Sequence, residues 1–169
     1  MEISELTNYF MQYGGIAIFI IVFMEYLNLP GFPAGIIMPM AGLFASQGEI
    51  SFPLVILITV SAGLLGSMVL YFLGYFGGDL LLRTYLKRFP KQKEKIDKSM
   101  IYLQKKGCIG VFFAKLMPMI RTLISIPAGA VKMNVYRYAI SSLAGIFIWN
   151  MVFVGAGYLF GDTCFKYFI

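Results

Sequence analysis

Residues 115–122 read KLMPMIRT, a short polar interruption in otherwise apolar sequence. The flanking stretches, 107–114 and 122–131, are each shorter than the ~20 apolar residues that a helix needs to cross a bilayer. Pro118 lacks a backbone donor, so it bends or ends any helix that reaches it. We therefore expect a broken helical hairpin that enters the membrane and returns, with two cations near its tip.

The two cations are Lys115 and Arg121, and Glu25 is their candidate partner. A charged side chain at membrane depth costs about 2.5–3.5 kcal/mol on insertion scales, so it is usually partnered and functional. Instead of a functional role, Glu25 and Arg121 have the alternative of a buried ion pair that only fixes the packing of the hairpins. Lys115 has the alternative of extending its side chain to the cytoplasmic interface.

Glu25 lies in a second pattern of apolar, broken and apolar sequence. Residues 14–24 are apolar, 29–35 read LPGFPAG, and apolar sequence resumes over 36–45. Such a dense run of glycine and proline breaks a helix. The residues expected to break the two hairpins are Pro30, Pro33, Pro39, Pro118 and Pro127.

The composition is typical of an all-α integral membrane protein. Hydrophobic residues make up 59% of the chain and charged residues 13%, whereas about a quarter of a soluble domain is charged. The mean hydropathy is +0.79. Uncharged stretches over 50–78 and 138–161, of 29 and 24 residues, predict two membrane-spanning helices.

The positive charge is concentrated in one segment. Nine of the 14 Lys and Arg residues lie between positions 83 and 106, within a net charge of +6. A basic block beside membrane spans indicates the cytoplasmic side and anionic lipid rather than nucleic acid. We expect residues 80–106 in the cytoplasm, either as an amphipathic helix on the headgroups that ends at Gly107 or as a solvated loop. With no His and two Cys, we expect no metal site and no cofactor.

The two halves of the chain resemble each other. Pro30 precedes Pro39 by nine residues, Pro118 precedes Pro127 by nine, and the two pairs are 88 residues apart. Each half then holds one re-entrant hairpin, which crosses zero times, and one spanning helix, so the halves must be inverted in the membrane. The expected single domain, 1–169, divides into an interfacial segment 1–13, repeat one 14–78, a basic amphipathic connector 79–106 and repeat two 107–162.

At this point the sequence resembles the DedA family, also called the SNARE-associated or VTT-domain family, over roughly residues 14–162. The most specific match is the segment from Phe113 to Gly129. The other matching residues are Glu25, Met40-Ala41-Gly42, Leu64-Leu65-Gly66, Gly107, Met133, Tyr136-Arg137-Tyr138, Gly145, Trp149 and Gly157 to Gly161.

The resemblance implies a multi-pass protein of the bacterial cytoplasmic membrane that moves lipids between leaflets. The implied substrates are undecaprenyl phosphate or a phospholipid such as phosphatidylethanolamine, and the family is associated with proton coupling. The family's acid and two arginines correspond to Glu25, Lys115 and Arg121. Three positions depart from the family pattern: Lys115 replaces an Arg, and Gly35 and Ser67 replace acids.

The residues themselves support a phosphate site without catalysis. Arg121 can give two parallel hydrogen bonds to a phosphate, Lys115 adds a point charge, and Thr122 adds a hydroxyl. Glu25 is assigned to proton coupling, because its protonation would release a cation for the phosphate. The alternatives left open are a proton-coupled small-solute transporter, a lipid phosphatase, and a structural or assembly factor.

Overall fold

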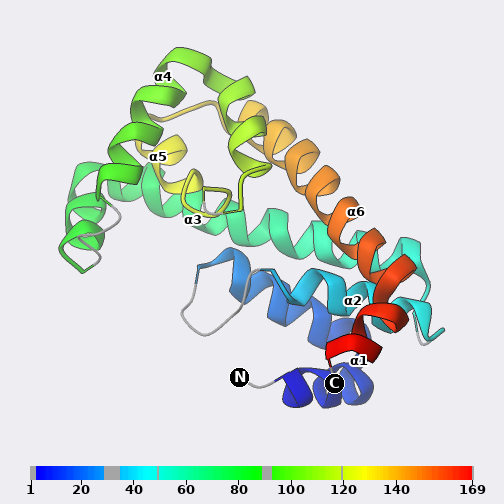
Figure 1. The fold of residues 1–169 in the computed structure, drawn as a ribbon. Coiled ribbons are helices and arrows are strands. Elements are labelled where there is room, and N and C mark those ends of the chain that lie inside the picture. Colours follow the sequence, from blue (N-terminus) through cyan, green and yellow to red (C-terminus); the bar gives the residue numbers. More distant parts are fainter. Residues whose placement is uncertain (1–2, 29–34, 49, 89–92, 119, 169) are drawn as a thin grey trace. The chain divides into compact units, whose positions relative to one another are not determined.

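Every regular element that the computed structural model describes is an α-helix, as the sequence predicts. The described residues are 3–28, 35–48, 50–88, 93–118 and 120–168. The helices, shown in Figure 1, are α1 (Ile3–Tyr26), α2 (Ile37–Ser46), α3 (Phe52–Arg88), α4 (Lys93–Lys115), α5 (Ser125–Ala130) and α6 (Val135–Phe168).

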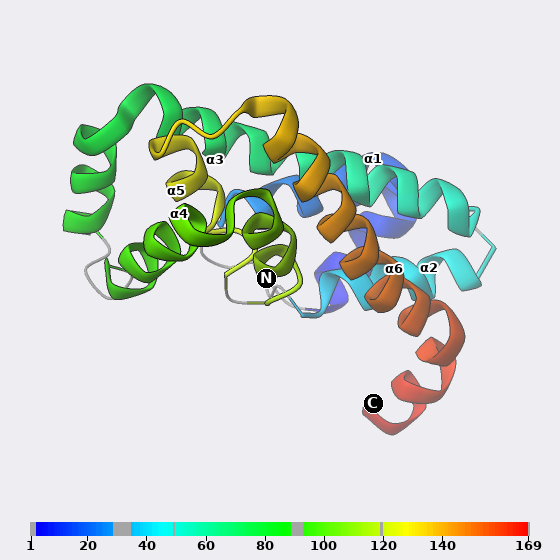
Figure 2. The same cartoon turned by 90° about the horizontal axis from the view of Figure 1, so that it is seen from above.

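Helices α3 and α6 are long and apolar enough to cross a membrane. The segments that could span a membrane are Phe52–Gly77 and Val135–Phe160, with 26 residues each. They overlap the two spans predicted from the sequence. Figure 2 shows each helix as an uninterrupted ribbon. Both helices expose large apolar side chains, which suit contact with lipid tails. Examples are Leu57, Phe76, Ile140, Val152 and Leu159.

The ends of the long helices follow local sequence signals. Helix α3 continues past Gly78 to Arg88, into the expected connector, because no further glycine or proline occurs before Pro90. Helix α6 begins at Val135 because the Asn134 side chain accepts hydrogen bonds from the backbone N–H groups of Tyr136 and Arg137, at 3.1 and 3.2 Å.

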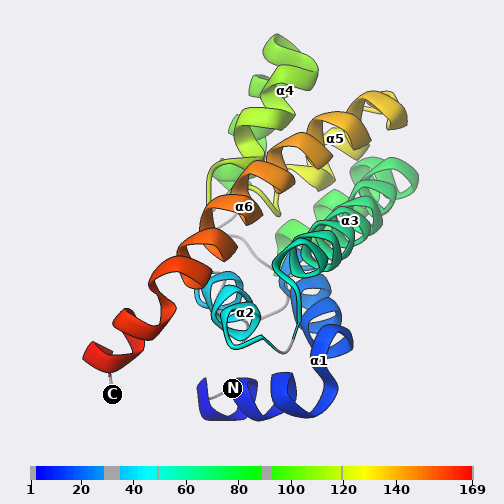
Figure 3. The ribbon, with the colours of Figure 1, turned by 90° about the vertical axis from the view of Figure 1, so that its right-hand side faces the viewer.

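Helices α1 and α4 each contain one sharp kink at a glycine. The backbone angles are φ 53° and ψ −128° at Gly14, and φ 54° and ψ −130° at Gly107. A side chain makes this conformation costly, so glycine is favoured at both positions. Figure 3 shows the kink in α1, where an N-terminal helical segment meets the apolar one. In α4 the kink ends the basic helical segment at Gly107, as the sequence predicts.

The helices form two compact units. Unit 1 consists of residues 1–63 and 147–169, and unit 2 of residues 64–146. Unit 1 therefore holds α1, α2, the start of α3 and the C-terminal part of α6. Unit 2 holds the rest of α3, α4, α5 and the start of α6. Each unit thus contains residues from both predicted repeats.

In unit 1 the backbones of α2 and α6 touch at two glycines. A Cβ at Gly42 would overlap the carbonyl oxygen of Val154, and a Cβ at Gly157 would overlap that of Pro39. Glycine is thus required on both helices, because any side chain would push the two helices apart. Small residues at helix contacts are the usual means of close packing in membranes.

Unit 2 contains the corresponding contact between α5 and α3. A Cβ at Gly129 would overlap the carbonyl oxygen of Tyr71, and a Cβ at Gly74 would overlap that of Ile126. Gly129 lies 87 residues after Gly42, and Gly157 lies 83 residues after Gly74. In each unit, therefore, the short helix of one half of the sequence packs on the long helix of the other half.

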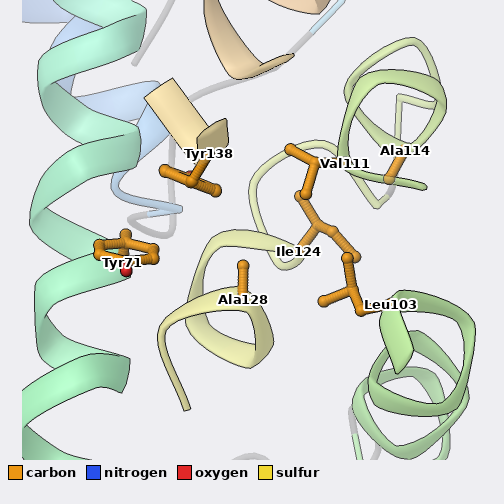
Figure 4. Packing of buried hydrophobic residues seen from close by; sticks show 7 residues of the cluster. All are labelled: Tyr71, Leu103, Val111, Ala114, Ile124, Ala128 and Tyr138. Carbon is orange, nitrogen blue, oxygen red and sulfur yellow. The ribbon is translucent and has the colours of Figure 1, made fainter. Parts of the chain in front are cut away.

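The apolar core of unit 2 surrounds this contact. Figure 4 shows the ring of Tyr138, from α6, beside that of Tyr71, from α3, with Ile124 between Val111 and Leu103 of α4. The two tyrosine rings stack with their centroids 4.5 Å apart. This core holds the end of α4 and the start of α5 in place, and the buried cations lie at that break.

Candidate functional site

Helix α4 ends at Lys115, three residues before Pro118, and α5 does not begin until Ser125. Four backbone hydrogen bonds close the turn, among them those from Leu116 N–H to the Phe113 carbonyl at 3.1 Å and from Arg121 N–H to the Met117 carbonyl at 3.0 Å. The break predicted from the sequence is therefore a turn between α4 and α5. Lys115 lies at the start of this turn and Arg121 near its end.

Both cations are buried in unit 2. The exposed fraction is 1% for Lys115 and 0% for Arg121, and Thr122 beside it is 7% exposed. Fully buried cations are rare because desolvation costs several kcal/mol per ion. Because Lys115 is almost fully buried, its side chain does not extend to the interface, and its amino group lies inside unit 2.

Hydroxyl groups surround the Lys115 ammonium. Its Nζ donates to Ser67 Oγ at 2.8 Å and to Ser125 Oγ at 3.1 Å. It also lies 5.9 Å from the ring centroid of Tyr138, within cation–π range. Lys115 thereby links α3, α5 and α6 from the end of α4.

The close approach of Lys115 to α6 depends on Gly145. A Cβ built at Gly145 would lie 2.5 Å from Lys115 Cβ and 3.0 Å from the Phe112 carbonyl oxygen. The lysine stem therefore occupies the space that a side chain at Gly145 would need.

Tyr138 brings further hydroxyls to the same place. Its hydroxyl donates to the Ser67 carbonyl oxygen at 3.2 Å and also interacts with the side chains of Ser125 and Ser142. Tyr71, stacked on it, donates its own hydroxyl to the Met133 carbonyl oxygen. These bonds hold the two stacked tyrosines in place, and Tyr138 is the one that lies beside Lys115.

Glu25 belongs to unit 1, where it lies next to the last residue of α1 and is 3% exposed. The neighbouring Tyr26 donates its hydroxyl to Asn150 Oδ1 at 3.2 Å. Because Lys115 and Arg121 belong to unit 2, the pairing of Glu25 with either cation stays a prediction.

The predicted hairpin-breaking prolines occupy different positions. Pro118 is exposed in the turn, whereas Pro39 and Pro127 stand third in α2 and α5. A helix can accept proline in its first turn, since the N–H groups there have no intrahelical partner. Pro30 and Pro33 lie outside the described residues.

Sequence reasoning missed most of the residues that contact Lys115. From the sequence, Ser67 and Tyr138 enter only through the comparison with the family pattern, and Ser125 and Ser142 are given no role. The internal repeat contains one signal that points to Ser67. Ser67 and Asn150 are 83 residues apart, which is also the spacing between Gly74 and Gly157. Both positions accept a hydrogen bond from the last residue of a helix, Lys115 of α4 or Tyr26 of α1.

Comparison with known proteins gives a consistent family signal. The family model of the VTT domain matches residues 32–159. The uncharacterized membrane protein YkoX of Bacillus subtilis is 33% identical over 141 residues, which are 81% of this chain and 62% of that protein. The chain thus spans less than two thirds of that relative's length.

Two further relatives carry functional names. Undecaprenyl phosphate transporter A of Bacillus subtilis is 32% identical over 160 residues, covering 95% of this chain and 76% of the relative. A protein of Lactococcus lactis subsp. cremoris called alkaline phosphatase-like protein is 30% identical over 157 residues, covering 90% and 73%. No solved structure matches the chain.

Proposed function

The chain belongs to the VTT-domain (DedA) family of membrane proteins, and we propose that it carries a phosphate-bearing lipid between the leaflets of the bilayer. The substrate classes are a polyprenyl phosphate such as undecaprenyl phosphate and a phospholipid such as phosphatidylethanolamine. The name of the Bacillus subtilis transporter supports the first of these.

The observation that carries the proposal is the burial of Lys115 and Arg121 at the break between α4 and α5. A phosphate group inside a membrane protein needs charge and hydrogen-bond donors to replace its hydration. Arg121 offers a fork of two parallel donors, Lys115 a point charge, and Thr122 a hydroxyl. If these two positions served stability alone, apolar side chains of similar volume would do as well as buried charged ones.

The proposed transport mechanism uses inverted repeats. Each repeat comprises a re-entrant hairpin and one spanning helix, an arrangement in which substrate binds where broken helices meet. The equivalent kinks at Gly14 and Gly107 support this reading of the two halves. Residues 80–106 face the cytoplasm in this topology, because the positive-inside rule favours that side for a basic segment.

Reconstitution into liposomes tests the proposal. Wild-type protein should exchange labelled polyprenyl phosphate or phospholipid between leaflets, and Arg121→Ala should slow the exchange by about tenfold or more, because it removes a bidentate charged contact. Arg137→Ala is the matched control, since Arg137 is exposed on α6. Equal exchange by wild type and Arg121→Ala would argue against the proposed site.

Glu25 is the proposed coupling residue. When charged, it competes with phosphate for a cation, and when protonated it releases that cation. The expected result of Glu25→Gln is leaflet exchange that no longer varies with pH between 5 and 8, measured in liposomes with the same pH on both sides. Exchange by Glu25→Gln that kept the wild-type pH dependence would remove Glu25 from the mechanism.

A second candidate function follows from the relative called alkaline phosphatase-like protein. The sequence contains no His, and Glu25 by itself provides a weak acid–base set. Release of inorganic phosphate from a polyprenyl phosphate by the purified protein would favour the phosphatase. Exchange without release favours the transporter, and competition by soluble solutes would favour a small-solute transporter.

A further inference from the structure

A group of four buried hydroxyls lies in unit 2, and two of them accept hydrogen bonds from Lys115. We call it the hydroxyl cluster; its members are Ser67, Ser125, Ser142 and Tyr138. Ser67 is 1% exposed and the other three are 0% exposed. The members come from α3, α5 and α6, so three helices supply them to one place.

The hydrogen bonds from Lys115 leave donors in the cluster. An ammonium can only donate, so Ser67 and Ser125 accept from it through their oxygen lone pairs. Each serine keeps its own O–H proton, which the ammonium cannot accept and which can therefore be donated to an anion. Within the described part of the chain, Ser142 Oγ has no hydrogen bond of ordinary geometry, although it is buried near the Tyr138 hydroxyl.

The sequence around the cluster is free of acids. Unit 2 contains Asp79, Glu94 and Asp97, and all three belong to the connector 79–106. Residues 64–78 and 107–146 contain no Asp or Glu. The immediate sequence environment of the cluster therefore supplies a cation and hydroxyl donors, which is the chemistry that recognises an oxyanion.

We propose that the hydroxyl cluster binds the oxygens of a phosphoryl group beside Lys115, with Ser67 and Ser125 as direct ligands. The two serine oxygens lie 2.8 and 3.1 Å from the same nitrogen, so an oxyanion that binds Nζ on the side of the serines can reach both hydroxyls. This inference rests on the proposed function and extends it from the charged residues to the neutral ones. The phosphoryl group is either that of a lipid headgroup or free phosphate.

Thermal unfolding of the purified protein in detergent tests the assignment. The double variant S67A/S125A removes both serine hydroxyls. The matched control is Thr59→Val, since Thr59 is also buried but its hydroxyl bonds to the Ile56 carbonyl of its own helix at 3.1 Å. Each protein is titrated separately with inorganic phosphate and with a polyprenyl phosphate, and unphosphorylated polyprenol serves as the blank.

A phosphorylated ligand should raise the unfolding temperature of wild type and Thr59→Val. The double variant should need about tenfold more ligand for the same shift, because it lacks two hydrogen bonds to an anion. A response to both ligands identifies the phosphoryl group itself as the ligand, and a response to the polyprenyl phosphate alone identifies the lipid headgroup. Since the readout is a shift relative to each variant's own ligand-free value, a less stable variant remains informative.

The inference is overturned if wild type and the double variant respond at the same concentrations, or if neither ligand shifts the wild type. Leaflet exchange measured in parallel separates this from the proposed function. Serine-dependent phosphate binding without exchange would contradict transport and keep the site. Equal exchange and equal binding by wild type and the double variant would contradict the site and keep transport.

Discussion

Lys115 is a residue for which stability and function make different demands. It is 1% exposed and donates to two neutral hydroxyls. Burying an ammonium costs several kcal/mol, whereas each hydrogen bond to a charged group returns about 1.5–3 kcal/mol. The proposed phosphate binding is the reason we give for a cation at this position.

We expect Lys115→Met to lower leaflet exchange by about tenfold without lowering the unfolding temperature. Methionine fills similar volume and carries no charge, so the desolvation cost of the buried ammonium is lost together with its hydrogen bonds to Ser67 and Ser125. The measurements are thermal unfolding in detergent and exchange in liposomes. Lys105→Met, at an exposed position of α4, is the control and should change neither. A fall of many degrees for Lys115→Met would instead make Lys115 a structural link between helices.

At the scale of helices, paired glycines determine how α2 packs on α6 and α5 on α3. We expect Gly42→Ala and Gly129→Ala each to cost about 1–3 kcal/mol of stability, because the added methyl group overlaps backbone that cannot rotate away. Gly155→Ala is the matched control on α6, where no atom lies within 4 Å of the added Cβ. Denaturant or thermal unfolding provides the measurement, and three equal results would contradict the packing.

The kink in α4 permits a purely conformational test. A Cβ at Gly107 meets nothing within 4 Å, so any cost of Gly107→Ala comes from its backbone angles of φ 54° and ψ −130°. We expect a loss of about 1–3 kcal/mol, compared with Gly155→Ala in the same unfolding assay. An unchanged stability would mean that α4 straightens at this position without penalty.

At the scale of the whole molecule, charge separates between the two units. Unit 1 contains five acids and one base, whereas unit 2 contains 13 bases and three acids, which together give the net charge of +6. Unit 2 is therefore the part of the chain that attracts anions. The basic segment 83–106 accounts for most of this excess and sets the expected orientation in the membrane.

The proposed orientation is open to a labelling experiment. Cys108 and Cys164 are first replaced by serine, and a single cysteine is then introduced as Lys105→Cys, at an exposed position in the basic segment. An impermeant maleimide should label it in inside-out vesicles and leave it unlabelled in intact spheroplasts. The control is Gln47→Cys, also exposed, which the inverted topology puts on the opposite side. Labelling of Lys105→Cys in spheroplasts would reverse the orientation.

The sequence by itself determined the two long helices and the position of the main break. Two long uncharged stretches predicted α3 and α6, Pro118 predicted the break after α4, and Gly107 predicted the end of the basic helical segment. These features are local, because hydrophobic runs and the backbone limits of glycine and proline act within a few residues. The same residues carried the resemblance to the VTT-domain family.

Only the tertiary structure decided which side chains surround Lys115. Ser67 and Ser125 are 48 and 10 residues away in sequence, and Tyr138 comes from a third helix. Serine is common in helices and has no local feature that indicates a distant partner. Its role depends on the rotation of each helix and on the packing of α5 against α3, which follows from side-chain volumes at the helix contacts rather than from any short pattern.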